Sequence, residues 1–145
     1  MKRSGTRGDD PLGMIFDTSI WIGLASGLVS GEAIVKAAGN EPVFISAISL
    51  GELSFGVESC LDPATRMLRT RFLRSLEHRP VLDVSSLTAS AFGILAAFMK
   101  QSGRSPRTRV NDLWIAAQAL ENDYALLTTN LKDFADLPGL RVACL

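Results

Sequence analysis

Acidic side chains lie at points where a parallel sheet would gather them. Asp17 directly follows residues 14–16, a short apolar run with the composition of a buried strand. Asp133 comes soon after a later run of the same kind, and Asp112 opens an expected helix. Glu52 lies several residues into another helix, so its placement is less constrained. Because ligand sites form beyond the carboxyl ends of parallel strands, the spacing predicts a carboxylate site at that edge.

A carboxylate site of this kind favours a hard divalent cation. Three or four converging carboxylates repel one another and do not all ionise unaided. Mg²⁺ takes oxygen ligands, retains waters and suits phosphate substrates. The single histidine, His78, provides neither a histidine pair for acid/base cleavage nor a multi-histidine metal site. The carboxylates must therefore supply any chemistry.

Each of these acids also has a purely structural explanation. Asp17 suits a helix N-cap, and Asp133 suits an ordinary turn. Asp112 would complement a helix dipole, with Asn111 capping beside it. Glu52 would be a solvated helix residue. Taken singly, these explanations compete well, and the joint placement of the four acids is what favours a site.

The elements that must position the acids alternate between strands and helices. Strands are expected at residues 14–16, 43–45, 81–82, 125–128 and 140–144, and helices at 20–28, 32–38, 46–57, 64–77, 87–101 and 112–121. This alternation predicts an α/β fold with a mostly parallel four- to five-stranded sheet between helical layers. Residues 1–13 are polar and glycine-rich and are expected to form a flexible tail before a single domain at 14–145.

Composition excludes several classes of protein. The 145 residues include 15 Lys+Arg and 15 Asp+Glu, so no polybasic coat drives nucleic-acid binding. Two cysteines, Cys60 and Cys144, cannot build a zinc framework or a disulfide scaffold, which favours a reducing cytoplasmic setting. The uncharged stretches 18–31 and 84–99 are too short to cross a membrane and are expected to be core helices.

Four segments, in this order, resemble the motifs of PIN-domain ribonucleases. They are MIFDTSIWI (14–22), ISAISLGELSFGVE (45–58), NDLWIAAQAL (111–120) and LTTNLKDF (127–134) followed by LPGL (137–140). Their order and spacing are especially similar to those of VapC toxins from bacterial toxin–antitoxin pairs. The resemblance covers nearly the whole chain, from residue 14 to about residue 142.

The resemblance implies a single PIN-like domain and a Mg²⁺- or Mn²⁺-dependent endoribonuclease. It further implies a homodimer that a cognate antitoxin protein holds inactive. By position in the motifs, Asp17 and Asp112 correspond to the main metal ligands. Glu52 corresponds to the supporting acid and Asp133 to the fourth acid.

Other residues acquire expected roles from the same comparison. Ser19 matches the polar residue that supports the first acid. Asn130 stands where some members carry an acid, which leaves one metal ion or two open. Arg104, Arg107 and Arg109 lie in a basic loop just before the third acid and are candidates to hold RNA phosphates. A solvated basic loop explains these arginines equally well.

The resulting hypothesis is hydrolysis of RNA phosphodiester bonds, in which water attacks in line and leaves a 5′-phosphate and a 3′-hydroxyl. One alternative is a PIN-like module that binds RNA or protein without cleavage. Another is a phosphatase of the aspartyl-phosphate type, which also places an acid after its first strand. That chemistry usually needs a second acid two residues later, where this chain has Ser19.

Overall fold

The computed structural model describes residues 10–145, so most of the tail expected at 1–13 lies outside the described residues. Within 10–145, the strands form one parallel sheet in the order β3-β2-β1-β4-β5. The strands are β1 (Met14–Phe16), β2 (Val43–Ser46), β3 (Val81–Leu82), β4 (Ala125–Thr128) and β5 (Arg141–Cys144). The parallel sheet predicted from the sequence is confirmed, including its fifth strand.

Six α-helices and two short 3₁₀ turns complete the described part of the chain. The helices are α1 (Thr18–Ser26), α2 (Gly31–Ala38), α3 (Ala47–Glu58), α4 (Pro63–Ser75), α5 (Ser86–Gln101) and α6 (Val110–Asn122), and the turns are η1 (Pro106–Arg109) and η2 (Leu131–Asp133). Several helices begin at side-chain caps: Ser30 accepts from the Ala33 N–H, and Ser85 forms a capping box with Thr88. These local signals explain why the helices begin close to the predicted positions.

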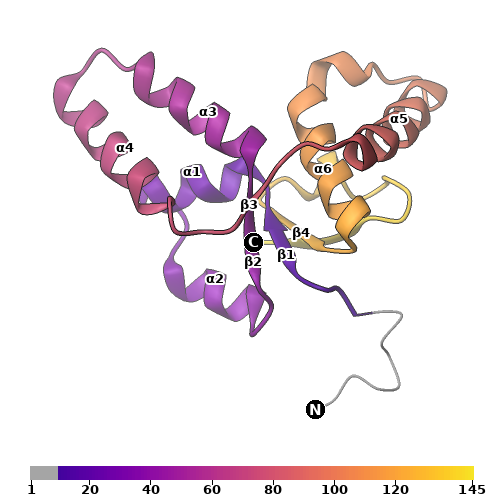
Figure 1. Cartoon of the computed structure of the whole chain (residues 1–145), viewed down its shortest axis with the longest axis horizontal. Coiled ribbons are helices and arrows are strands. Elements are labelled where there is room, and N and C mark those ends of the chain that lie inside the picture. The colour runs from indigo at the N-terminus through magenta and orange to yellow at the C-terminus, as the bar shows by residue number, and fades with distance from the viewer. Residues whose placement is uncertain (1–9) are drawn as a thin grey trace.

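Alternate strand residues face two different helical layers. Ile15 and Leu126 are fully buried against α5 and α6, whereas Phe16 and Leu127 are buried on the face that α1 and α2 cover. Figure 1 shows α3 with α4 and α5 with α6 extending on opposite sides of the strands. The result is a sheet between helical layers, as the alternation of elements predicted.

Helix α6 lies directly against the centre of the sheet. Ala116 and Ala117 have no exposed surface, and α6 contacts both β1 and β4. Because alanine has a small side chain, the helix axis can approach the strands closely. This packing carries Asp112, in the first turn of α6, to the carboxyl edge of the sheet.

Two segments differ from the sequence-based expectation. Helix α1 begins at Thr18, two residues earlier than predicted. The basic segment expected to be a loop ends in the 3₁₀ turn η1, which Pro106 opens and the Ser105 hydroxyl caps. Helix α6 follows this turn without a gap, so Arg109 is held at a helix junction rather than in an open loop.

No helix within residues 10–145 is long and apolar enough to span a bilayer. The two uncharged stretches fold as the sequence predicted, with α1 in the first and α5 in most of the second. Each of these helices buries one side against the core.

Candidate active site at the carboxyl edge of the sheet

Asp17 is buried at the end of β1, in the middle of the sheet. Its side chain is only 4% exposed, and its backbone N–H donates to the Leu127 carbonyl at 2.9 Å. Asp17 Oδ2 accepts hydrogen bonds from Ser19 Oγ at 2.8 Å and from Thr128 Oγ1 at 2.9 Å. Among the described residues, no hydrogen bond reaches Oδ1, and the carboxylate caps no N–H of α1. Asp17 therefore occupies the N-cap position of α1 without capping the helix. Its Oδ1 is available to accept another partner.

The turn after β4 is tied to Asp17 through the same two hydroxyls. Thr128 Oγ1 accepts from the Asn130 N–H at 3.0 Å, and Ser19 Oγ accepts from the Thr129 N–H at 3.4 Å. Each hydroxyl thus donates to the carboxylate and accepts from the turn, which fixes the orientation of Asp17. The side chain of Asn130 itself is exposed at this edge.

A short chain of hydroxyls holds Glu52. Thr18 Oγ1 donates to Glu52 Oε1 at 2.6 Å and lies 2.7 Å from Ser49 Oγ. Because the Thr18 hydroxyl has one proton and gives it to Glu52, Ser49 must donate to Thr18. Thr18 and Ser49 are both buried, so this chain is shielded from water. It joins the start of α1, beside Asp17, to the middle of α3.

Asp112 is electrostatically coupled to the other three acids. Burial raises the pKa of its carboxyl to about 6, and the charge of Asp17 is the next largest cause. Arg109 opposes this shift, while Glu52 and Asp133 add smaller increases to the pKa. The structure therefore brings together the four acids that the sequence singled out.

Arg109 bridges two of these acids. Its Nη1 lies 2.9 Å from Asp133 Oδ1, and its Nε lies 3.7 Å from Asp112 Oδ2. The other two candidate arginines lie differently: Arg104 pairs with Asp136 at 2.6 Å, and Arg107 is exposed. Of the three, only Arg109 is paired with the acid cluster.

The donors suit a hard cation, although residues 10–145 contain no preformed group of three or more acidic, histidine or cysteine side chains that could hold a metal. The cluster offers carboxylate oxygens only, and Asp17 Oδ1 is one that accepts no hydrogen bond from the described chain. One guanidinium cannot neutralise four carboxylates, and the raised pKa of Asp112 reflects its burial first and then the repulsion of the other acids. A divalent cation with oxygen preference fits this donor set once the acids draw together.

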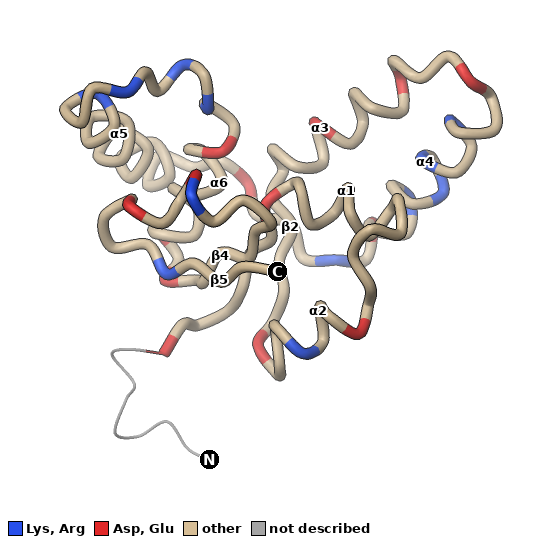
Figure 2. The backbone as a smooth tube through the Cα atoms, turned by 180° about the vertical axis from the view of Figure 1, so that it is seen from behind, with Lys and Arg blue, Asp and Glu red and all other residues tan. Residues whose placement is uncertain are grey.

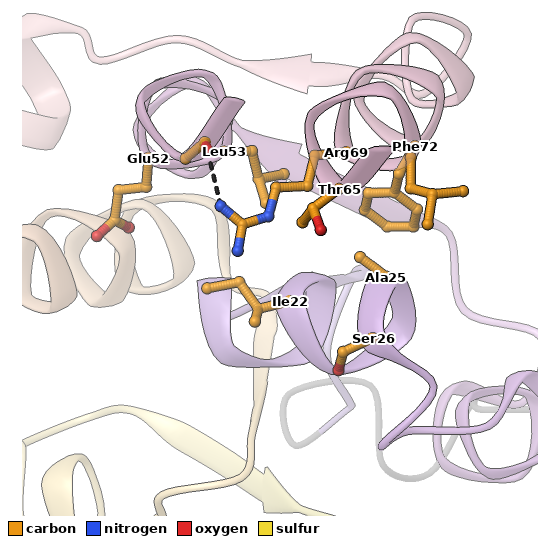
Figure 3. Close-up of a pocket in the computed structure, with 10 residues that line it drawn as sticks. Ile22, Ala25, Ser26, Glu52, Leu53, Thr65, Arg69 and Phe72 are labelled. Atoms are coloured by element: carbon orange, nitrogen blue, oxygen red, sulfur yellow. Dashed lines mark hydrogen bonds between the residues drawn. The ribbon is translucent and has the colours of Figure 1, made fainter. Parts of the chain in front are cut away.

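A pocket opens beside Glu52, between α1, α3 and α4 (Figure 3). It has a volume of about 470 Å³ and a mostly apolar lining that includes Ile22, Leu53, Leu68 and Phe72. Arg69 crosses it and donates to the Gly56 carbonyl at 2.8 Å. Figure 2 shows that Lys and Arg gather along α4. The pocket lining thus combines an apolar wall with the guanidinium of Arg69 and the carboxylate of Glu52.

Sequence reasoning missed the hydroxyls that orient the acids. Thr18, Ser49 and Thr128 are all buried polar residues, and each lies within three residues of an acid or at a strand end that faces one. The available signal was the placement of Thr next to Asp17 and at the end of β4. Such residues are equally common as caps and turn formers, so the signal was ambiguous.

Comparison with known proteins gives one consistent family. The family model described as "PIN domain" matches residues 14–140. The chain is 33% identical to Ribonuclease VapC5 of Mycobacterium tuberculosis, over 89% of this chain and 90% of the relative. It is 34% identical to Ribonuclease VapC of Rickettsia bellii, over 90% of this chain and 95% of the relative.

Solved structures with the same fold include two that are described as VapBC bound to DNA. VapBC from Salmonella typhimurium, bound to DNA, has a TM-score of 0.74 and 26% identity, covering 92% of this chain and 98% of its own. VapBC2 from Rickettsia felis, bound to a promoter DNA fragment, has a TM-score of 0.77 and 24% identity, covering 91% and 98%. At that lower identity, the second similarity concerns the fold alone.

Proposed function

Because the chain belongs to the PIN-domain family, we propose that it is a divalent-metal-dependent endoribonuclease and the toxin of a toxin–antitoxin pair. The observation that carries this proposal is the electrostatic coupling of Asp112 to Asp17, Glu52 and Asp133 at one edge of the sheet. Relatives that are named ribonucleases and match almost the whole chain support the same activity.

Asp17 and Asp112 are the residues that would hold the metal ion, with Mg²⁺ as the first candidate and Mn²⁺ as the second. When bound, such an ion polarises a phosphoryl oxygen and lowers the pKa of a coordinated water. Asp17 contributes a fixed carboxylate, because Ser19 and Thr128 hold its Oδ2 in place. Asp112 contributes a carboxylate whose raised pKa makes it ready to exchange a proton for a cation.

The other residues orient water and RNA. Glu52, which Thr18 holds, would position the attacking water and accept its proton, and Asp133, which pairs with Arg109, would help to position the water or a second metal ion. Asn130 is exposed at the end of the turn after β4 and supplies a neutral amide toward the RNA. Arg104, Arg107 and Arg109 provide positive charge for RNA phosphates. In-line attack then leaves a 5′-phosphate and a 3′-hydroxyl.

The partner that controls this activity is a cognate antitoxin protein. The related structures described as VapBC complexes support a partner of this class. The pocket between α1, α3 and α4 offers this partner an apolar surface next to Glu52. Leu68 in its wall is 65% exposed, and such apolar surface is typical of a protein-binding site. We further propose that the protein acts in the cytoplasm as a homodimer.

Cleavage of structured RNA by the purified protein tests the proposal. The wild type should cut RNA with Mg²⁺ and not with EDTA, whereas Asp17→Asn and Asp112→Asn should each lose at least ~10²-fold in rate. Asp123→Asn is the matched control, because Asp123 is an exposed acid that pairs with Arg141 at the opposite edge of the sheet from the acid cluster. Cleavage that survives either active-site substitution would contradict the metal-acid assignment.

Two further readouts separate the alternatives. RNA binding without cleavage by every variant would favour a PIN-like binding module. Turnover of a small phosphomonoester with intact RNA would favour an aspartyl-phosphate-type phosphatase. In this chain, Ser19 donates to Asp17 at the position where that phosphatase chemistry needs its second acid.

A further inference from the structure

The guanidinium of Arg109 lies where a cation is needed. We propose that Arg109 is a built-in counter-cation of the acid cluster, which a divalent metal must displace before the carboxylates can close around it. This inference rests on the proposed metal-dependent function and adds a residue that sets the affinity for the metal.

Arg109 lies between acids from two different elements of the fold. Asp112 belongs to α6 and Asp133 to η2, the turn that follows β4. Arg109 reaches both, with Nη1 at 2.9 Å from Asp133 Oδ1 and Nε at 3.7 Å from Asp112 Oδ2. Positive charge therefore lies beside Asp112, one of the two proposed metal ligands, and a metal ion held by Asp112 would meet it.

The ion pairs of Arg109 with the two acids are loose. A two-pronged arginine–carboxylate pair would place two nitrogens on one carboxylate. The guanidinium of Arg109 instead places one nitrogen near each of two acids, and only its contact with Asp133 has hydrogen-bond length. Its Nη2 is buried and has no hydrogen-bond partner within residues 10–145. A guanidinium held this way compensates charge and can still be displaced by a compact ion of twice its charge.

The side chain of Arg109 can leave the acids without a large backbone motion. Arg109 ends η1 and directly precedes α6, and its side chain is 24% exposed. The side chain can therefore leave the acids toward solvent by rotation alone. Its guanidinium lies 2.9 Å from the Asp133 carboxylate and 3.7 Å from the Asp112 carboxylate. Arg109 thus stabilises the cluster in the absence of a metal and competes with a metal for it.

Mn²⁺ binding to the full-length chain, measured by electron paramagnetic resonance and calorimetry, tests this inference without using activity. Arg109→Gln should bind Mn²⁺ at least ~3-fold more tightly than the wild type, because a nearby positive charge is removed. Arg109→Lys, which retains the charge, should stay closer to the wild type. In EDTA, Arg109→Gln should unfold at a lower temperature than the wild type, because the acids lose their counter-cation.

Arg141→Gln is the matched control. Arg141 also pairs with an aspartate, Asp123, and also has one buried guanidinium nitrogen without a partner in the described part of the chain. It lies at the start of β5, which is the opposite end of the strand from the acid cluster. Arg141→Gln should change the stability but not the affinity for Mn²⁺.

A second measurement uses the wild type alone and covers the case in which Arg109→Gln does not fold. The ¹⁵Nε resonance of Arg109, assigned with Arg109→Lys, should shift when Mg²⁺ is added, and that of Arg141 should not. Unchanged or weaker Mn²⁺ binding by folded Arg109→Gln, or an unmoved Arg109 resonance in Mg²⁺-bound protein, overturns the counter-cation role alone. Absence of Mn²⁺ binding in both the wild type and Arg109→Gln overturns the metal-dependent function and this inference with it.

Discussion

The hydroxyl of Thr18 donates a hydrogen bond to Glu52 Oε1 at 2.6 Å, across 34 residues of sequence. Thr18 directly follows Asp17, so the residue next to the first acid, Asp17, positions the second acid, Glu52. Because Thr18 gives its one proton to Glu52, Ser49, three residues before Glu52, donates to Thr18. The start of α1 and the middle of α3 are thereby coupled in a part of the site that is shielded from water.

Thr18→Val should lower RNA cleavage while leaving RNA binding nearly unchanged. Valine keeps the shape of threonine but cannot orient Glu52, and loss of such a supporting bond typically costs about 10-fold in activity. The loss should appear in kcat and not in KM, and stability should fall by only about 1 kcal/mol. Steady-state kinetics and denaturant unfolding measure these quantities. Thr18→Ser, which restores the hydroxyl, should recover most of kcat; failure to recover would contradict a positioning role.

Thr128→Val should weaken metal binding more than it weakens folding. The substitution removes a donor to Asp17 Oδ2 and the acceptor for the Asn130 N–H. Outer hydrogen-bond partners of metal ligands are typically worth 10- to 100-fold in affinity or activity, so we expect about a 10-fold loss of Mn²⁺ affinity. Calorimetric titration checks this. The adjacent exposed residue provides the control, since Thr129→Val should bind Mn²⁺ like the wild type.

The sequence predicted the frame of the site well because short apolar runs followed by acids are strong local signals. The sequence predicts strands at residues 14–16 and 125–128 with their carboxyl ends at one edge, and β1 and β4 pair in parallel. That pairing places Asp17 next to the turn that leads to Asp133. The alternation of strands and helices was sufficient to predict this edge of the sheet.

The supporting contacts could not be predicted, because they join distant segments through common residue types. Thr18 and Thr128 read as cap or turn residues, and only the folded chain shows which carboxylate each one reaches. Arg109 and Asp112 are three residues apart, which suggests an ion pair on a helix. The second partner, Asp133, comes from η2, a distant segment of the chain, and has no local signature.

Acidification should weaken metal binding through Asp112. Burial and the neighbouring acids raise the pKa of this carboxyl to about 6, so at pH 5 it is mostly protonated and must release a proton to bind a cation. We expect Mn²⁺ affinity and cleavage rate to rise between pH 5 and 7. Titrations at several pH values, with buffers of different ionisation enthalpy, would detect the released proton. A flat affinity profile across this range would contradict the assignment of Asp112 as a ligand.

The raised pKa of Asp112 also makes the metal-free protein, kept in EDTA, less stable as the pH rises. Asp112 has a pKa of about 6 in the folded chain against 3.8 as its ordinary value, so between these two values the folded state binds more protons than the unfolded state. The free energy of unfolding therefore loses the contribution of Asp112 as the pH rises through this window. Asp112→Asn should gain stability relative to the wild type from pH 4 to pH 7. Thermal unfolding of both proteins across this range measures the difference, which should not grow above pH 7.

Leu68→Glu should release the enzyme from its antitoxin without inactivating it. Leu68 is 65% exposed and lines the pocket beside Glu52, so the free protein tolerates the substitution, while a partner seated there would bury an unpaired charge. We expect at least a ~10-fold loss of antitoxin affinity, with RNA cleavage by the free protein unchanged. Co-expression growth assays and calorimetry with the purified pair measure the two effects. Leu87→Glu is the control, because Leu87 is 69% exposed on α5, outside this pocket. If the antitoxin inhibited both variants equally well, it would have to bind another surface.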